Sequence, residues 1–338
     1  MLLRNDIEQR EIDNLDPRAA KSRFTRGRQF EEPKDEVRTE FQRDRDRIIH
    51  SKSFRRLMHK TQVFLAPEGD HFRTRLTHTL EVSQIARTIA RALNYNEDLT
   101  EAIALGHDLG HTPFGHNGEE VLNKIHPGGF HHNVQSLRVV DVLEGSRHRE
   151  GQGMNLTAEV RDGIVNHTGP NTPFTLEGQI VHLADRIAYI NHDIDDALRS
   201  GVILFEDLPK SSIELFGNSH RSRINSLVID VIKSSEGKDK ILQSPDFKKE
   251  MEHLRKFMFA NVYKNSRVKR DEDLNKVETV IKSLYEYYCA NPELLPDDLR
   301  LIADKDGVQE AVKDYVAGMT DRFALSTYTD IFVPKAWK

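Results

Sequence analysis

The chain has 338 residues, of which 49 are Lys or Arg and 54 are Asp or Glu, so its formal net charge is −5. A single cysteine, Cys289, excludes a disulfide framework and any zinc or iron–sulfur site built from cysteines. No apolar run reaches the about 18 residues of a membrane span, and the first residues lack the apolar core of a secretory signal. We therefore expect a cytoplasmic protein with no membrane segment.

The first 40 residues are polar, contain few β-branched residues and are interrupted by Pro17, Gly27 and Pro33. Prolines and glycines inside a polar stretch break regular elements. We therefore expect residues 1–40 to form a polar arm with at most short helices.

Positive charge is concentrated near this end of the chain. Residues 1–60 carry 16 basic and 12 acidic side chains, although the whole chain is acidic. A basic segment on an acidic protein suits a local polyanion, such as the phosphates of a nucleotide or single-stranded nucleic acid. A solvated charged arm explains the same composition equally well, and composition does not separate the two.

After residue 40 the hydrophobic pattern is helical almost throughout. Apolar residues recur at helical spacing in 76–93, and again over more than five turns in 176–199. Alternation typical of a strand is confined to a weak TQVFL segment at 61–65. The chain is therefore predicted to be all-α. The C-terminal third adds predicted helices at about 213–234, 246–264, 272–289 and 308–323.

One of the sixteen histidines, His78, lies on the apolar stripe of the first of these helices. It shares that stripe with Val82, Ile85 and Ile89, at offsets that place all four side chains on one face. His78 is therefore predicted to face the core, either as a hydrogen-bonded core residue or as a metal ligand.

The stretch GHDLGHTPFGHNGEE, residues 106–120, has the highest density of histidine and acidic side chains. His107 and Asp108 are adjacent, so on a helix they lie about 100° apart and both can point into one concave site. His111 follows one turn after His107 on the same face. Imidazole and carboxylate ligands without thiolate suit Mn, Fe, Zn, Ni or Mg better than a structural zinc.

Two glycines and a proline then interrupt this helix and allow the chain to bend around the site. The bend can return His116 and Glu119 to the same place. A polar helix end followed by a Gly/Pro loop is the alternative interpretation. The number of histidines and acids within a few residues favours a reactive site.

The helix predicted at 176–199 contributes a polar stripe beside its apolar one. By itself such a stripe is typical of a solvated face, but next to a His–Asp motif it offers Asp185 as a further carboxylate ligand. In FHHNVQS, residues 130–136, the polar side chains either reach a phosphate or form a structural turn. The stripe consists of His182, Asp185, Tyr189, His192, Asp193 and Asp196.

These motifs together resemble those of a known family. His78, His107–Asp108 and Asp185 are similar to the H…HD…D motif of the HD phosphohydrolase superfamily. Five blocks in order narrow the resemblance to the deoxyguanosine triphosphate triphosphohydrolase family, over about residues 40–325. The blocks are SFRRLMHKTQVF, RTRLTHTLEVSQIAR, GHDLGHTPFGHNGEE, FHHNVQSLRV and DYVAGMTDRFA.

The resemblance implies an all-α HD-domain fold with additional C-terminal helices. After the arm, residues 41–205 would form the HD-domain catalytic core. Residues 206–338 would form a helical region that completes the nucleotide site and makes oligomer contacts, so we expect a homo-oligomer. The implied activity is metal-dependent hydrolysis of deoxynucleoside triphosphates at the α-phosphate, which releases a deoxynucleoside and intact inorganic triphosphate.

The resemblance also implies a role for each motif residue. The metal ligands would be His78, His107, Asp108 and Asp185. The metal would be Mn or Mg, with Fe, Ni and Zn as alternatives, and the open coordination positions would take water and a phosphate oxygen.

The catalytic residues implied are His116, Glu119 and His111. His116 would protonate the leaving 5′-oxygen or shuttle its proton, and Glu119 would orient His116. His111 would contact the α-phosphate region or have a structural role.

Six further side chains are implied to bind the substrate. Arg75 and Arg186 would meet phosphates, His132 would reach a phosphate, and the others would contact the sugar, where a tyrosine under C2′ would reject a ribose hydroxyl. The six are Gln62, Arg75, Arg186, Tyr189, Asp193 and His132.

Two other functions stay open at this point. One is another HD phosphohydrolase, either a nucleotidase or a phosphodiesterase. The second is a nucleic-acid-binding protein that uses the basic segment at 38–60 and keeps the metal for structure only.

Overall fold

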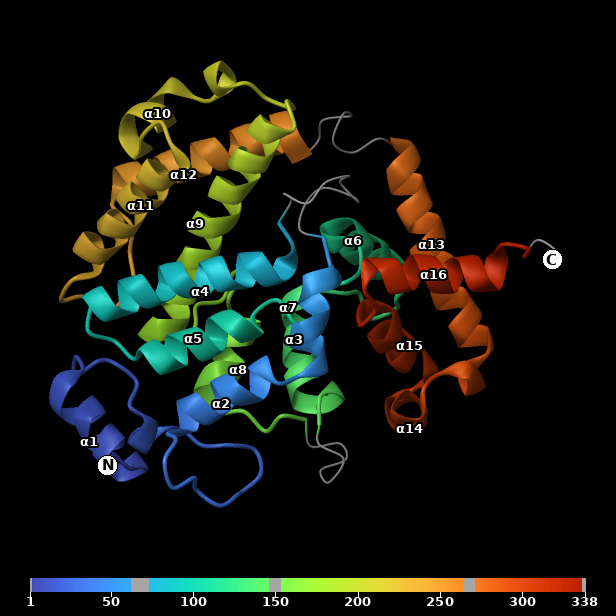
Figure 1. The fold of residues 1–338 in the computed structure, drawn as a ribbon, viewed down its shortest axis with the longest axis horizontal. Helices are drawn as coiled ribbons and strands as arrows, with labels where there is room; N and C mark the ends of the chain where they lie inside the picture. Colours follow the sequence, from blue (N-terminus) through green and yellow to red (C-terminus); the bar gives the residue numbers. More distant parts are fainter. Residues whose placement is uncertain (1, 62–72, 146–152, 264–270, 336–338) are drawn as a thin grey trace.

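The computed structural model describes residues 2–61, 73–145, 153–263 and 271–335 (Figure 1). Within these ranges the chain forms sixteen α-helices and no β-strand, so the all-α prediction is confirmed. None of the helices described is long and apolar enough to cross a bilayer. Gln62 and most of the TQVFL segment lie outside the described residues.

The first eight helices reach from the N-terminus to the middle of the chain. They are α1 (Arg4–Asn14), α2 (Glu40–Ile49), α3 (Lys52–Arg56), α4 (Arg75–Ala92), α5 (Glu97–Gly106), α6 (Gly115–Ile125), α7 (His132–Arg138) and α8 (Ala158–Val165).

The other eight begin with the longest helix of the protein, α9. They are α9 (Leu176–Arg199), α10 (Lys210–Phe216), α11 (His220–Ser235), α12 (Pro245–Met258), α13 (Asp271–Ala290), α14 (Asp297–Asp306), α15 (Val308–Ala317) and α16 (Asp321–Phe332).

Two hydrophobic cores hold these helices together. The first core is built by α2, α4, α5, α8, α9, α11 and α12. The second is built by α13, α15 and α16 together with Phe114, Val121, Leu122 and Phe130 from α6 and its flanks. In Figure 1 the C-terminal helices, orange to red, form a group on one side of the molecule, and α6 packs against α13.

The first 40 residues are attached to the first core by buried charged groups. The 11-residue helix α1 buries Arg4 and Glu8, which form an ion pair with each other, and Arg4 also donates to Glu40 of α2 at 2.8 Å. This differs from the predicted polar arm. A local pattern of polar residues does not reveal that their partners lie on another helix.

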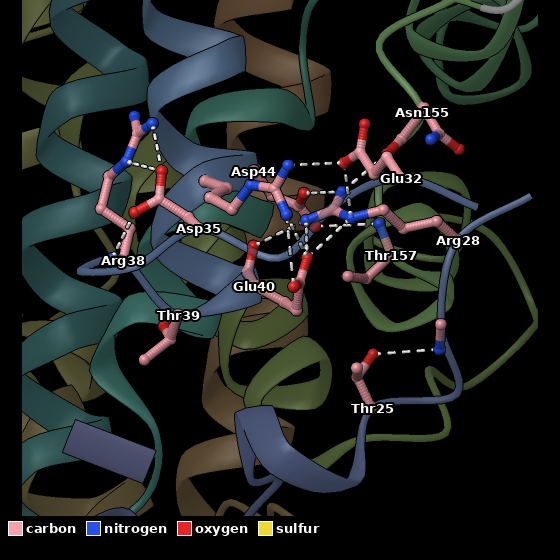
Figure 2. A network of polar contacts seen from close by, with 12 residues as sticks. Thr25, Arg28, Glu32, Asp35, Arg38, Thr39, Glu40, Asp44, Asn155 and Thr157 are labelled. Carbon is pink, nitrogen blue, oxygen red and sulfur yellow. Dashed lines mark hydrogen bonds and ion pairs between the residues drawn. The ribbon is translucent and has the colours of Figure 1, made fainter. Parts of the chain in front are cut away.

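A network of arginines and carboxylates lies between this N-terminal segment and α2 (Figure 2). Arg28 pairs with Glu32 at 3.1 Å and also with Glu40 and Asp44. Glu32 also forms ion pairs with Arg43 at 3.0 Å and with Arg47 at 2.6 Å. Several of the basic side chains that suggested a polyanion site are therefore neutralised within the protein.

Two predicted C-terminal helices are each divided in the structure. The stretch 213–234 is split into α10 and α11 at Gly217, whose φ of +104° is accessible to glycine and ends α10. The stretch 308–323 is split into α15 and α16 by a turn around Gly318. The helix α14 was not predicted, although Leu299, Ile302 and Ala303 pack its apolar side against the second core.

Candidate active site

The four predicted metal ligands converge at the centre of the first core. His78 lies on α4, His107 and Asp108 follow α5, and Asp185 lies on α9; α4 packs against both other helices. His78 Nε2 is 3.1 Å from Asp185 Oδ1 and 4.0 Å from Asp108 Oδ2. His107 Nε2 is 3.5 Å from Asp108 and 3.8 Å from Asp185. Nitrogen and oxygen atoms from separate helices therefore surround one buried point.

His107 and Asp108 lie in a turn, not on the helix that the sequence predicted, because α5 ends at Gly106. The Ser136 hydroxyl on α7 accepts from the Gly110 amide at 2.9 Å and donates to the His107 carbonyl at 2.7 Å. A Cβ on Gly110 would lie 2.2 Å from the Ser136 backbone nitrogen. The glycine therefore permits the close approach of α7 that fixes the turn.

The state of His107 fits a metal ligand. Its Nδ1–H donates to the Ala104 carbonyl at 2.7 Å, which leaves a lone pair on Nε2. That Nε2 is fully buried and has no hydrogen-bond partner among the residues the structure describes. An orphaned buried nitrogen that faces two carboxylates has the donor chemistry of a divalent metal site.

The carboxylates of the site are held in their charged form. Burial opposes the ionisation of Asp108, but His107, His111 and Arg75 together lower its pKa well below the ordinary value. Burial acts in the same way on Asp185, whose pKa is nevertheless lowered, chiefly by its hydrogen bond with His78. Two ionised carboxylates in a buried site favour a cation there.

A second group of side chains borders this cluster and contains the predicted catalytic residues. His116 Nδ1 lies 2.9 Å from Glu119, and His132 Nδ1 lies 2.9 Å from the other oxygen of the same carboxylate. The ring of His111 stacks on His132 with centroids 4.0 Å apart. Glu119 thus joins an exposed histidine, His116, to a partly buried one, His132.

The charges within this second group are matched. Burial raises the pKa of Glu119, but the hydrogen bonds from His116 and His132 outweigh it and lower that pKa far below the ordinary value. Burial lowers the pKa of His132, yet Glu119 raises it overall. Burial, with Arg75, lowers the pKa of His111 well below the ordinary value and keeps that ring neutral.

Arg75, predicted to contact phosphate, is 1% exposed at the start of α4. Its Nη1 donates to Asp108 Oδ2 at 2.8 Å. In this arrangement its guanidinium pairs with one of the predicted metal ligands.

A cavity of about 630 Å³ opens beside α9 and is closed on its far side by α12. Arg186 and Tyr189, both predicted to bind substrate, line it. On α12, Arg255 and Lys248 add positive charge and Glu252 adds one negative charge. Burial raises the pKa of Tyr189 to about 12, so its hydroxyl stays protonated.

Asp193, the last predicted substrate contact on α9, is buried and does not line this cavity. Its carboxylate accepts a hydrogen bond from the Tyr263 hydroxyl. Burial raises the pKa of Asp193 to about 7. Tyr263 therefore hydrogen-bonds to the carboxylate that was predicted to contact the sugar.

His167, which was not predicted from the sequence, lies after α8 and is buried between the two groups. Its Nδ1–H donates to the Ile164 carbonyl at 2.7 Å, and its Nε2 lies 3.3 Å from His132 Nε2. Its ring is 4.9 Å from that of His107. A single histidine after a helix carries no motif, so only its place in the fold reveals it.

Comparison with known families agrees with this geometry. The HD domain model matches residues 75–190, and the model of a phosphohydrolase-associated domain matches residues 241–330. The first range contains all four predicted ligands. Fold and site together define an HD-domain protein of the phosphohydrolase class.

Three relatives, each named deoxyguanosinetriphosphate triphosphohydrolase-like protein, extend the match over the whole chain. The protein of Caldanaerobacter subterraneus subsp. tengcongensis is 57% identical over 100% of this chain and 98% of its own. That of Clostridium tetani is 47% identical over 99% and 97%, and that of Bordetella pertussis is 44% identical over 91% and 94%. The chain belongs to the deoxyguanosinetriphosphate triphosphohydrolase-like family, as the motifs predicted.

Proposed function

We propose that this protein is a metal-dependent triphosphohydrolase of deoxynucleoside triphosphates. It would cleave at the α-phosphate and release a deoxynucleoside and inorganic triphosphate. One observation carries the proposal: an orphaned, buried His107 Nε2 faces two carboxylates, and a hydrogen-bonded His116–Glu119 pair lies alongside. The full-length relatedness to proteins named as triphosphohydrolase-like supports it.

The proposed ligands of the metal are His78, His107, Asp108 and Asp185. We propose Mn or Mg, because two imidazoles and two carboxylates suit such ions and leave coordination positions open. A bound ion of this kind polarises a phosphate oxygen and lowers the pKa of water.

His116 is the proposed general acid for the leaving 5′-oxygen. Its side chain is 64% exposed, so a bound nucleotide can reach it. Because Nδ1 faces Glu119 at 2.9 Å, Nδ1–H donates to that carboxylate and Nε2 is left to hold a proton toward the substrate. His111 and His132, stacked behind, limit where the His116 ring can lie.

The cavity beside α9 is the proposed place of the nucleotide. A triphosphate carries about four negative charges and needs cations to meet them, and Arg186, Lys248 and Arg255 supply three. Tyr189 lies among them with a neutral hydroxyl. A tyrosine ring against C2′ would leave no room for a ribose hydroxyl, which supports a preference for deoxynucleotides.

The test is to incubate the purified protein with each deoxynucleoside triphosphate and with GTP, in the presence of Mn or Mg, and to separate the products by ion exchange. Intact triphosphate and a deoxynucleoside are expected. Pyrophosphate or orthophosphate would identify another HD phosphohydrolase. Absence of turnover with every nucleotide, alone and mixed, would overturn the proposal.

Partners and location belong to the same proposal. A homo-oligomer is expected from the family resemblance, and a cytoplasmic location from the composition of the chain. Single-stranded nucleic acid is a weaker candidate partner, since Arg28, Arg43 and Arg47 already pair with carboxylates. A binding protein of that kind would show a steep salt dependence of its affinity for DNA.

A further inference from the structure

The two halves of the candidate site belong to different hydrophobic cores. His78 and Asp185 lie on α4 and α9, whose apolar faces form the first core. His116 and Glu119 lie in the first turn of α6, whose Leu122 is fully buried in the second core with α13, α15 and α16. The distance between the metal ligands and the acid pair therefore depends on what joins the cores.

The segment between Asp108 and α6 runs from the first core to the second and so joins the two. Lys60 precedes Thr61, which forms an isolated β-bridge with Thr74 just before α4. Lys60 is 3% exposed, and its side-chain amino group contacts this segment. Its Nζ donates to the His111 carbonyl at 2.5 Å and to the Ala317 carbonyl at 3.0 Å. The buried amino group of one lysine thus connects the segment that contains His111 to the end of α15.

Asp321, the first residue of α16, makes a second connection. Its Oδ1 accepts from the Phe114 amide at 2.9 Å, and its Oδ2 accepts from the Thr61 amide at 3.0 Å. Both oxygens of one carboxylate are therefore occupied by backbone groups from two other segments. A carboxylate that receives two amides is a strong and directional contact.

Phe114, one of the two residues whose amides donate to Asp321, is the N-cap of α6. Phe114 has a φ of +63°, a left-handed conformation that is uncommon for any residue except glycine. Its ring is 8% exposed and packs in the second core. This backbone conformation sets the direction in which α6 leaves the turn, and with it the place of His116 and Glu119.

We infer that Asp321, together with Lys60, positions the His116–Glu119 pair relative to the metal ligands. The kinetic consequences of this inference rest on the proposed function. Its structural consequence is independent of that function. The C-terminal helices then have a role in catalysis without contributing a group that touches the substrate. Misplacement by about 1 Å in such an arrangement costs about 100-fold in rate.

The first variant pair for the test is Asp321→Ala, which removes both acceptors, and Asp321→Asn, which keeps one. Asp330→Asn is the matched control on the same helix, since Asp330 is 60% exposed and pairs only at the surface with Lys335. Lys60→Met tests the second connection if the Asp321 variants do not fold. Lys124→Met is its control, because the Lys124 side chain is 60% exposed.

Hydrogen–deuterium exchange reports the structural effect directly. Amides in 111–125 should exchange faster in Asp321→Ala, and less so in Asp321→Asn, whereas amides in 75–92 on α4 should be unchanged. Mn²⁺ affinity, measured by calorimetry, should stay within about twofold of the parent protein. Unchanged exchange in 111–125 for both Asp321→Ala and Lys60→Met would overturn the inference.

Kinetics then separate this inference from the proposed function. If the parent protein hydrolyses deoxynucleoside triphosphates, kcat should fall by about 10- to 100-fold in Asp321→Ala, with KM nearly unchanged. An unchanged kcat would overturn the positioning role. If the parent protein has no such activity, the proposed function fails, and the exchange experiment still decides whether Asp321 and Lys60 hold this segment.

Discussion

Asp108 is closely surrounded by polar side chains in the candidate metal site. It lies 3.5 Å from His107 and 3.2 Å from His111, and it accepts a hydrogen bond from Arg75. Asp108→Asn removes the negative charge but keeps an acceptor for the buried arginine. We expect this variant to lose Mn²⁺ binding in calorimetry, and hydrolysis with it, because one of two charged ligands is gone.

The control for this change is Asp304→Asn, since Asp304 is exposed on α14. It should bind Mn²⁺ like the parent protein. Retention of full Mn²⁺ affinity by Asp108→Asn would remove Asp108 from the ligand set.

His116 permits a test that separates proton transfer from metal binding. Its side chain is 64% exposed, so its removal leaves no cavity in either core. His116→Ala should bind Mn²⁺ normally and lose turnover by about 10²- to 10⁴-fold, the usual contribution of a general acid. Steady-state kinetics and calorimetry on one preparation measure both quantities.

A matched control exists on α12, where His253 pairs with Glu250 at 3.0 Å in the same i,i+3 arrangement as His116 and Glu119. His253→Ala should leave turnover unchanged. Normal turnover by His116→Ala would show that another group protonates the leaving oxygen.

Among the elements, α2 depends most on contacts made with the N-terminal segment. Asp44 on this helix has no exposed surface and pairs with Arg28, whose side chain is also almost fully buried (Figure 2). Arg28→Met should lower the free energy of unfolding by about 3–5 kcal/mol, because a buried carboxylate loses its cation. Urea denaturation followed by circular dichroism measures this loss.

Arg38 gives the comparison, since it pairs with Asp35 and Asp46 but its side chain is 48% exposed. Arg38→Met should cost about 0–1 kcal/mol, as surface ion pairs do. Equal effects of the two variants would mean that the buried network does not anchor α2.

Some helices could be predicted from the sequence and others could not. The predicted helices 76–93 and 176–199 agree with α4 and α9 to within one residue, because apolar periodicity and the caps Thr74 and Thr175 are local signals. The break at Gly217 and the partners of the first 40 residues were missed. Those features depend on backbone conformation and on residues distant in sequence.

The same distinction applies to the site. The motif residues His78, His107, Asp108 and Asp185 could be named because the resemblance assigns them, and the structure brings them together. The turn that holds His107, the tyrosine that hydrogen-bonds to Asp193 and the position of His167 could not be predicted. Each depends on a neighbour that only the packing of helices provides.

At the scale of the whole molecule, the N-terminal segment, α5 and α9 meet at one buried carboxylate. Glu177 has no exposed surface, and its Oε1 accepts from the Ala20 amide at 3.0 Å and from the Asn96 amide at 3.1 Å. Its Oε2 has no hydrogen-bond partner within the described part of the chain. Burial raises the pKa of Glu177 to about 7, from an ordinary value of 4.5.

This raised pKa makes the stability of the fold depend on pH. Between about 4.5 and about 7 the unfolded chain has released the proton of Glu177, whereas the folded protein keeps it. The free energy of unfolding should therefore fall as the pH rises through this window, by about 3 kcal/mol in all, and then level off. Glu177→Gln keeps an acceptor for both amides and removes the ionisation.

We therefore expect Glu177→Gln to be more stable than the parent protein at pH 8 and nearly equal to it at pH 5, when urea denaturation is measured at both values. The control for the loss of one negative charge is Glu286→Gln, because Glu286 is 66% exposed on α13. That control should change stability equally at both pH values. If Glu177→Gln also differed from the parent by the same amount at pH 5 and pH 8, the carboxylate would not be the group that binds a proton on folding, and its role would be limited to joining the N-terminal segment to α9.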